Sequence, residues 1–408
     1  MLMPSFAPPP RSLAPSSLAV VAAIVGAWAL PFPSAHGAEE WLLGRGDAEM
    51  KGVSSTQLHF PLELAWTAEL GNKAKRQGVI ATPVVRAGRV YVGSQTGNFA
   101  CLDLSTGKEV WKIKKDGFFE GNAGFTDNLV IAGCGDAFVY AFDVATGKEV
   151  WKFETQGEVH AGVNLWKDAE GKLRVLIGSY DNKLYCLDAA TGKKHWEYET
   201  ANYVNGAVAT FDNQVVFGGC DGTLYVLDIA SGKEVKKIEV GAYIGNNVAA
   251  DKGVAYLAHY GNRVAAFSFG DGAKLWEFGE REFPYYAAPA VNAKWVVAGG
   301  RDKRIYGLDR ATGEAKWQFR TRGDVDSSPV ICADSHVIAG SNDGYFYALD
   351  LSKGEEVWRY EVGAPVKTAP AVAGDFVLIG ADDGNVYCFK NGKAAAAPAP
   401  SPAAIPAP

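Results

Sequence analysis

Residues of the types that bind metals or act as nucleophiles are scarce in this chain. It has six histidines and six cysteines among 408 residues, and none of them falls into a Cys-x-x-Cys, Cys-x-x-Cys-His or His-Glu-x-x-His pattern. A Gly-x-Ser-x-Gly motif is missing as well. These absences argue against a haem attached through cysteines, a zinc peptidase and a serine hydrolase.

The chain also has no cluster of positive charge. Its formal net charge is −6, and no run of lysine or arginine stands out. Nucleic acids and anionic membranes attract basic proteins. We therefore expect no binding to nucleic acid.

No apolar run is long enough to cross a membrane. The longest, residues 18–30, has 13 residues and lies between Arg11 and the small residues that end at Gly37, whereas a bilayer needs about 20. This is the pattern of a secretory signal, so we expect residues 1–37 to be a signal peptide cleaved after Gly37 or Ala38. No cysteine lies near that cleavage site, so a lipid anchor is not expected. The mature protein should be periplasmic or secreted, with no transmembrane segment.

What the chain does have is an internal repeat. One slot recurs eight times at spacings of 40, 41 or 45 residues, and it is occupied by Trp66, Trp111, Trp151, Trp196, Lys236, Trp276, Trp317 and Trp358. Seven of the slots close a phrase such as LDLSTGKEVW. One unit of this length cannot bury its own apolar face, so the period predicts stacked units in a propeller or solenoid.

Each repeat reads as four short strands, because apolar runs with strand periodicity alternate with turn residues. The turn between the third and fourth strands begins with an aspartate such as Asp103, which can accept a hydrogen bond from the backbone two residues on. A glycine able to take positive φ, such as Gly107, follows four residues later. Acidic clusters between the second and third strands are interpreted as hairpin turns, since they lack the later glutamate of a calcium loop.

The two ends of the array predict a closed ring. The last unit, residues 368–393, stops after its third strand, while the residues around Trp66 form a lone fourth strand before the first full unit. Joining them gives an all-β fold, an eight-bladed β-propeller of four-stranded blades closed by an N-terminal strand that completes the last blade. The propeller then covers residues 61–393, after a lead segment at 38–60. The alanine- and proline-rich tail at 394–408 is expected to be disordered.

The tryptophans are predicted to wedge between neighbouring blades, where one ring buries roughly 150–250 Å². Lys236 breaks the pattern in blade 4, and Ser268 replaces the turn aspartate in blade 5. We expect the interface between these two blades to be the weakest. The cysteines occupy strand positions in separate blades, beyond the roughly 7 Å limit for a disulfide, so we expect mostly buried free thiols.

A candidate site follows from the geometry of a propeller. The residue just before each innermost strand lines the mouth of the central channel, and the repeats place there Ile80, Glu120, His160, Asn205, Gly245, Tyr286, Asp326 and Lys367. The candidate ligand-binding ring comprises Glu120, His160, Asn205, Tyr286, Asp326 and Lys367. Its oxygen atoms suit a hard cation, and its lysine and histidine suit an anion; a solvated ring without a ligand is the alternative. Aromatic residues nearby could form a collar that binds a partner: Phe118, Phe119, Tyr203, Tyr243, Phe283 and Tyr285.

The phrase Asp-x-x-Thr-Gly-Lys-x-x-x-Trp, repeated at about 40 residues across 61–393, resembles the repeat of the pyrroloquinoline-quinone-like (PQQ-like) propeller superfamily. The resemblance implies one of two branches. One comprises quinone-dependent dehydrogenases; the other comprises non-enzymatic scaffolds such as the propeller subunit of the outer-membrane barrel assembly machinery. That subunit is usually lipid-tethered, and this chain departs from it there. The fold alone does not choose between the branches.

The dehydrogenase branch implies adjacent cysteines over the cofactor, calcium ligands, a catalytic aspartate and long inserted loops. No two cysteines are adjacent here, and the loops are mostly short. We therefore predict no cofactor and no catalytic residue, with a small PQQ-dependent oxidoreductase holding PQQ and calcium as the alternative. The first hypothesis is an exported, monomeric, non-catalytic scaffold that binds an envelope protein partner or ligand through its channel mouth and loops. A sugar- or peptide-binding sensor module is the third.

Overall fold

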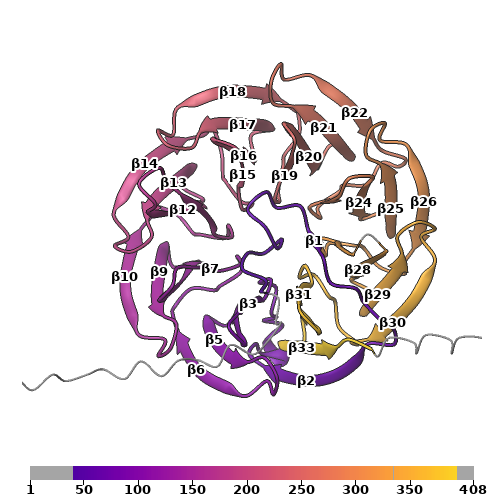
Figure 1. Cartoon of the computed structure of the whole chain (residues 1–408), viewed down its shortest axis with the longest axis horizontal. Helices are drawn as coiled ribbons and strands as arrows, with labels where there is room; N and C mark the ends of the chain where they lie inside the picture. Colours follow the sequence, from indigo (N-terminus) through magenta and orange to yellow (C-terminus); the bar gives the residue numbers. More distant parts are fainter. Residues whose placement is uncertain (1–39, 334, 393–408) are drawn as a thin grey trace, which may run out of the picture. The chain divides into compact units, whose positions relative to one another are not determined.

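The computed structural model describes residues 40–333 and 335–392. They form eight β-sheets arranged as blades around a central axis (Figure 1), so the predicted eight-bladed all-β propeller is confirmed. The short 3-10 turn η1 (Lys73–Lys75) is the one helical element in this part of the chain, where no helix is long and apolar enough to cross a membrane. The predicted signal peptide and C-terminal tail lie outside the described residues.

Each blade has an inner strand, two middle strands and an outer strand. The inner strands are β3 (Val84–Arg86), β7 (Gly124–Phe125), β11 (Asn164–Lys167), β15 (Ala209–Phe211), β19 (Ala249–Asp251), β23 (Ala290–Val291), β27 (Val330–Cys332) and β31 (Ala371–Ala373). The second strands are β4 (Arg89–Gly93), β8 (Leu129–Cys134), β12 (Leu173–Gly178), β16 (Gln214–Gly218), β20 (Val254–His259), β24 (Trp295–Gly300), β28 (His336–Gly340) and β32 (Phe376–Gly380).

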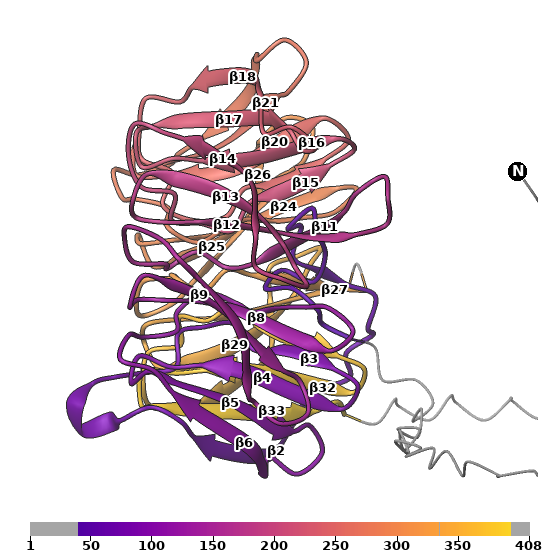
Figure 2. The ribbon, with the colours of Figure 1, turned by 90° about the vertical axis from the view of Figure 1, so that its left-hand side faces the viewer.

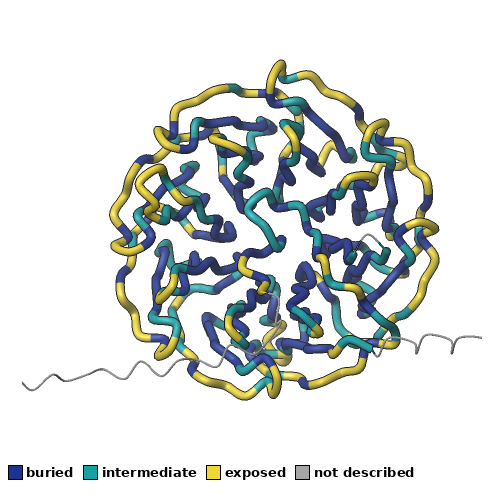
Figure 3. Tube along the Cα trace, in the orientation of Figure 1, coloured by how far each residue is buried: buried dark blue, intermediate teal, exposed yellow. Residues whose placement is uncertain are grey.

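The third and outer strands complete the blades. The third strands are β5 (Asn98–Asp103), β9 (Phe138–Asp143), β13 (Lys183–Asp188), β17 (Thr223–Asp228), β21 (Arg263–Ser268), β25 (Arg304–Asp309), β29 (Tyr345–Asp350) and β33 (Asn385–Lys390). The outer strands are β6 (Glu109–Lys114), β10 (Glu149–Glu154), β14 (Lys194–Glu199), β18 (Glu234–Glu239), β22 (Lys274–Phe278), β26 (Ala315–Arg320), β30 (Glu356–Glu361) and β2 (Glu63–Glu69). Residues of the middle strands are almost all buried, whereas outer strands are mostly exposed (Figure 3), so the cores lie between blades.

The N-terminal strand closes the ring. β2 pairs antiparallel with β33, from Glu63 opposite Lys390 to Glu69 opposite Asn385. Its sheet has the order β2-β33-β32-β31, so the first part of the propeller supplies the outer strand of the last blade. The predicted closure is therefore confirmed, and it removes the open end that an unclosed array would have to cap.

Each of six outer-strand tryptophans joins its blade to the next one. Trp151 Nε1 donates a hydrogen bond to the carbonyl oxygen of Ala189, 3.1 Å away. Gly192 lies against the same indole: its φ is +70°, and a Cβ there would approach Trp151 Cε3 to 2.5 Å. The repeat needs glycine at this position both for its conformation and for its lack of a side chain. The same arrangement recurs at Trp66, Trp111, Trp196, Trp276 and Trp317.

The aspartate that begins each of these turns acts slightly differently from the prediction. Asp188 Oδ1 accepts hydrogen bonds from the backbone N–H and the hydroxyl of Thr191, three residues on rather than two. In some blades the residue two positions on donates as well, as Ala145 does to Asp143. The threonine of the repeat phrase therefore holds the aspartate in place.

Residues 41–60 cross the ring on the side opposite η1 (Figure 2), which the repeat pattern did not predict. The segment has no repeat of its own, but its carbonyl oxygens accept hydrogen bonds from inner strands of five blades, the first from the N–H of Val85 to Trp41. Ala48, Glu49, Lys51 and Gly52 accept them from the N–H groups of Thr210, Ala250, Val291 and Ile331, respectively. β1 (Val53–Ser54) then adds to blade 7 by pairing parallel with β27. The lead segment therefore closes one end of the central channel.

The prediction for the cysteines is confirmed. All six are free thiols; five are buried, and Cys220 is half-buried. Burial raises the pKa of the Cys186 thiol to about 12. Such a thiol stays protonated and unreactive at neutral pH.

Candidate functional site

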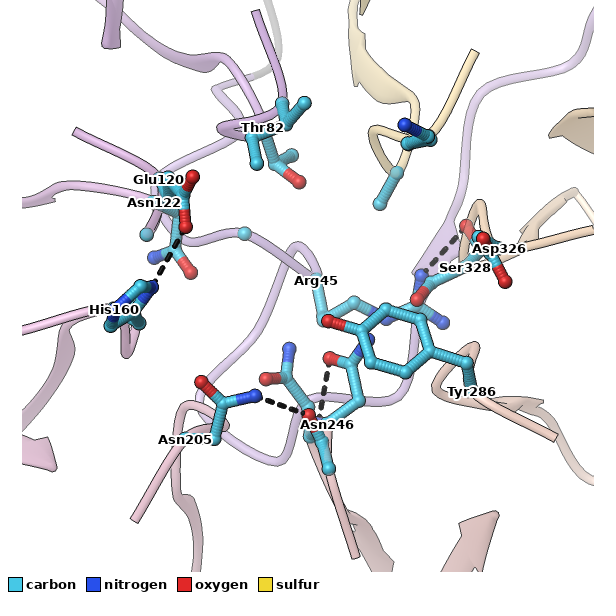
Figure 4. Close-up of a pocket in the computed structure, with 18 of the residues that line it drawn as sticks. Arg45, Thr82, Glu120, Asn122, His160, Asn205, Asn246, Tyr286, Asp326 and Ser328 are labelled. Atoms are coloured by element: carbon cyan, nitrogen blue, oxygen red, sulfur yellow. Dashed lines mark hydrogen bonds and ion pairs between the residues drawn. The ribbon is translucent and has the colours of Figure 1, made fainter. Parts of the chain in front are cut away.

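All eight residues that the repeats place at the channel mouth line one cavity of about 470 Å³, part of which is drawn in Figure 4. The alignment of repeats therefore predicted correctly which side chains face one another around the axis. That Glu120, His160, Asn205, Tyr286, Asp326 and Lys367 bind a ligand stays a prediction.

His160 is held between two carboxylates. Its Nδ1 lies 2.8 Å from Glu120 Oε2, and its Nε2 lies 2.9 Å from Glu158 Oε2. Burial opposes the charged imidazolium, but the hydrogen bonds to Glu120 and Glu158 outweigh it, so the pKa of His160 is raised. Burial likewise opposes ionisation of Glu120, yet the hydrogen bonds from His160 and Gln95 lower its pKa. The geometry favours an ion pair at the mouth.

A second set of mouth residues was missed by sequence reasoning. Each lies in the turn between the second and third strands and contacts a ring residue. The contacts are Gln95 Nε2 to Glu120 Oε1 at 2.9 Å, Tyr180 hydroxyl to Asn205 Oδ1 at 2.9 Å, Arg301 Nε to Asp326 Oδ1 at 2.8 Å, Asn342 Nδ2 to Asp326 Oδ2 at 3.0 Å, and the ion pair of Lys367 with Asp382. Their equivalent position in each repeat is the signal that could have identified them, but the turn residues by themselves indicate only hairpins.

Four aromatic rings lie in a row across the mouth of blades 2 to 4: His160, Tyr180 and Tyr203 are stacked, and Phe118 is tilted by 46° to the imidazole. Phe118 lies 4.6 Å from His160, His160 lies 4.2 Å from Tyr180, and Tyr180 lies 4.4 Å from Tyr203 between ring centroids. The stack fixes the plane of the imidazole, which the two carboxylates already hold at its nitrogen atoms. His160 therefore has little freedom to turn.

The floor of the cavity comes from the lead segment. Gly44 and Arg45 line it together with residues that lie deeper than the ring, among them Asn122 and Ser328. Arg45 is 1% exposed. Its Nη1 and Nη2 donate to the carbonyl oxygens of Ser328 and Pro289, each at 3.1 Å, and so tie the segment to blades 7 and 6. The cavity is a cup, open at the ring and closed below by residues 44–45.

The predicted aromatic collar is only partly correct. Phe119 and Tyr285 are buried, because both pack into cores between blades. Tyr203, Tyr243 and Phe283 are 45%, 59% and 48% exposed, and Tyr260, which the prediction omitted, is 39% exposed. The exposed aromatic residues therefore gather on the mouth side of blades 4 to 6 instead of surrounding the channel.

The ring does not fit a calcium ion. Glu120 is held by Gln95 and His160, and Asp326 is held by Arg301 and Asn342. Among the residues that the structure describes, no group of three or more His, Cys, Asp or Glu side chains could hold a metal ion. Calcium takes six to eight oxygen ligands. We therefore derive no chemistry through a calcium-bound quinone.

The repeat has a match among protein families. The family described as "Outer membrane protein assembly factor BamB" matches residues 63–201, 135–235 and 301–395, which is more than half of the chain. The chain belongs to this family of PQQ-like repeat propellers. A BamB protein from Xanthomonas campestris pv. campestris is 32% identical over 79 residues, or 18% of this chain. That match spans only 20% of the relative's length.

Solved structures share the fold of this BamB-family chain. BamB from Moraxella catarrhalis is 19% identical with a TM-score of 0.67, over 83% of this chain and 100% of that one. Quinohemoprotein alcohol dehydrogenase from Comamonas testosteroni is 17% identical with a TM-score of 0.73, over 88% and 82%. The computationally designed Ika8 protein is 21% identical with a TM-score of 0.69, over 81% and 100%. A BamB protein, an alcohol dehydrogenase and a designed protein share this fold, so the fold does not decide the activity.

Proposed function

We propose that this protein is an exported, non-catalytic scaffold of the cell envelope that binds a protein partner through the mouth-side loops of its propeller. The match to a family named for outer-membrane protein assembly supports this proposal. The periplasm is the compartment that this function requires, and a partner that takes part in assembling outer-membrane proteins is the one that the family name favours.

The exposed aromatic residues of blades 4 to 6 carry the proposal. The backbone N–H of Tyr260 donates to the carbonyl oxygen of Tyr243 at 3.0 Å, so the loops that bear these residues are joined. Phe283 lies in the corresponding connection of the next blade. Aromatic side chains are enriched at protein interfaces, where one ring contributes a large contact area. We call Tyr203, Tyr243, Tyr260 and Phe283 the aromatic patch.

The test is the affinity of the mature chain for the barrel-assembly component of its own outer membrane, measured with purified proteins. The double substitution Tyr243→Ala and Phe283→Ala should weaken binding about tenfold or more, since two exposed rings at a centre of contact are lost. Val357→Ala is the matched control, because Val357 is 41% exposed on the outer strand of blade 7, away from the patch. Equal affinity of the double variant, or no binding by the unaltered chain, would contradict the proposal.

The quinone hypothesis is tested separately by calorimetric titration of the mature chain with pyrroloquinoline quinone in calcium-containing buffer. We expect no one-to-one binding, because the carboxylates of the ring are engaged by His160, Gln95, Arg301 and Asn342. Binding at micromolar concentration or below, with one quinone per chain, would replace the scaffold by an oxidoreductase. This outcome is independent of the aromatic patch.

A further inference from the structure

Blade 5 has a histidine at a turn position where other blades have serine. His259 ends β20 and leads into the turn to β21, and Ser179 and Ser341 hold the equivalent position in blades 3 and 7. The hydroxyl of Ser179 accepts a hydrogen bond from the backbone N–H of Asp181, two residues on, at 3.2 Å. In blade 5, His259 Nδ1 accepts the same bond from the N–H of Gly261 at 3.1 Å. The imidazole therefore takes the place of the serine hydroxyl, but unlike serine it titrates near neutral pH.

The imidazole is buried, and its second nitrogen atom has no partner. His259 is 4% exposed. Because Nδ1 accepts a hydrogen bond, the neutral ring carries its proton on Nε2. Nε2 has no hydrogen-bond acceptor in the described part of the chain, and Glu277 Oε1, 3.9 Å away, is too distant to be one. The neutral ring is thus held by a single hydrogen bond, the one from Gly261.

The charged groups around His259 come from the two strands beside β20. Glu277 and Lys274 act on the imidazole from β22, and Arg263 acts on it from β21. Residues 241–244, in the loop that contacts the turn from blade 4, carry no charge. Burial lowers the pKa of His259, Arg263 and Lys274 lower it further, and Glu277 opposes them. The ring is therefore neutral at about pH 7 and becomes charged only in acid.

The turn that His259 holds also carries Tyr260, a member of the aromatic patch. The N–H of Tyr260 donates to the carbonyl oxygen of Tyr243, another member, at 3.0 Å. The next residue is closely packed: a Cβ on Gly261 would lie 2.8 Å from His259 Nδ1 and 2.9 Å from the Cβ of Ala242. Imidazole, turn and neighbouring loop are in direct contact, so the position of Tyr260 depends on the hydrogen bond at Nδ1.

We propose that His259 is a pH switch for the aromatic patch, which releases the turn that bears Tyr260 when the imidazole takes up a second proton. In the imidazolium both nitrogen atoms carry hydrogen, so no orientation of the ring can accept the bond from Gly261. The two facing N–H groups then repel each other, while Nε2 attracts the carboxylate of Glu277. The effect on partner binding rests on the proposed function, whereas the release of the turn does not.

The experiment compares the mature chain with His259→Ser, which keeps an acceptor at the turn but does not titrate. NMR of the labelled imidazoles follows the protonation of His259, and the serine variant identifies its signal. Amide hydrogen exchange of Tyr260 and Gly261 is measured at about pH 7.5 and about pH 4.5, each relative to an unstructured peptide at the same pH. We expect their protection to fall about fivefold or more in acid in the unaltered chain. In His259→Ser it should be the same at both pH values.

Three results would overturn the switch: equal protection at both pH values in the unaltered chain, an equal loss in His259→Ser, or a His259 ring that is still neutral at about pH 4.5. His259→Gln, whose amide oxygen also accepts without titrating, is the second variant in case the serine variant does not fold. Glu277→Gln should move the transition to lower pH, because it removes the group that favours the imidazolium. A transition that moves to higher pH would contradict the assigned role of Glu277.

The affinity for the barrel-assembly component, measured at the same two pH values, tests the consequence for binding. It should fall about tenfold or more in acid for the unaltered chain and clearly less for His259→Ser. An equal fall in both chains would overturn control of the patch by His259. No binding by the unaltered chain at either pH would contradict the proposed function, and the exchange of Gly261 would then decide on the switch alone.

Discussion

Lys236 Nζ lies 2.6 Å from the carbonyl oxygen of Gly270, one residue beyond the turn position that accepts a hydrogen bond from a tryptophan Nε1 in six other blades. The lysine therefore makes a hydrogen bond between blades 4 and 5, to a different carbonyl of the turn, but does not replace the packing of an indole. Gly272, the glycine of that turn, has correspondingly more room: a Cβ there would lie 3.4 Å from the nearest side-chain atoms instead of about 2.5 Å.

Lys236→Trp is expected to strengthen this interface. A tryptophan would restore the missing contact with Gly272 and, by the pattern of the other blades, donate to the carbonyl oxygen of Phe269. We expect the free energy of unfolding to rise by about 1–2 kcal/mol, from the additional apolar area buried. Urea denaturation measures it, with Lys237→Trp on the exposed neighbouring position as the control. A decrease in stability would show that blades 4 and 5 do not have the spacing of the others.

The turn glycine of blade 3 is expected to be far less replaceable than an ordinary positive-φ glycine. In Gly192→Ala, the new methyl group would lie 2.5 Å from the Trp151 indole, and the alanine would have to adopt a φ of +70°. In Gly253→Ala, φ is +76° but nothing lies within 4 Å. We expect losses of about 3–4 kcal/mol and about 1 kcal/mol, respectively, because only the first combines overpacking with strain. Thermal denaturation of both variants is the measurement, and equal losses would refute the role of the indole.

Stability should depend on the protonation of His160. Its folded pKa is raised by Glu120 and Glu158, after burial has opposed the charge. The stabilisation is therefore fully present below the unfolded pKa of about 6.5 and is lost as the pH rises through the folded pKa. His259 and His336 act with the opposite sign, because burial lowers their pKa values.

A comparison with His160→Gln isolates this effect from the other histidines. The difference in unfolding free energy between the unaltered chain and the variant should shrink as the pH rises from about 6.5 toward 9. Lys367 acts on Glu120, and Tyr180 and Phe118 flank the imidazole, so none of these residues is changed in the test. A difference that grows with pH would mean that the imidazole is held in its neutral form.

The lead segment should protect specific amide groups from hydrogen exchange. In a chain that begins at Gln57, the N–H groups of Thr210, Ala250, Val291 and Ile331 lose their acceptors. They should exchange about tenfold or more faster than in the mature chain. The N–H of Val163 is the control, since it donates to Asn122 in the neighbouring blade. Unchanged protection of the four groups would show that the segment is not fixed on the ring in solution.

The repeat in the sequence was sufficient to predict the blades, the closure by the strand around Trp66 and the positions of the mouth residues. The contacts between neighbouring blades recur at a nearly constant spacing along the chain. In each repeat, residues equivalent to Asp188 and Gly192 form a turn, and a residue equivalent to Trp151 packs onto it. Because the pattern occurs in several copies, it can be recognised even in blade 4, where Lys236 replaces the tryptophan. The cysteines follow from the same register, because equivalent positions in separate blades are far apart.

Only the tertiary structure decided what the mouth residues contact and what closes the cup. Glu120 and His160 are 40 residues apart, and Arg45 and Ser328 are 283 apart. Such pairs depend on the ring bringing distant side chains together and on rotamers that the repeat does not specify. The sequence of the lead segment has no repeat that predicts its contacts. Its backbone pairs with the inner strands of several blades in turn, and these strands are distant in the sequence. Its role as the floor of the cup therefore emerged only from the folded chain.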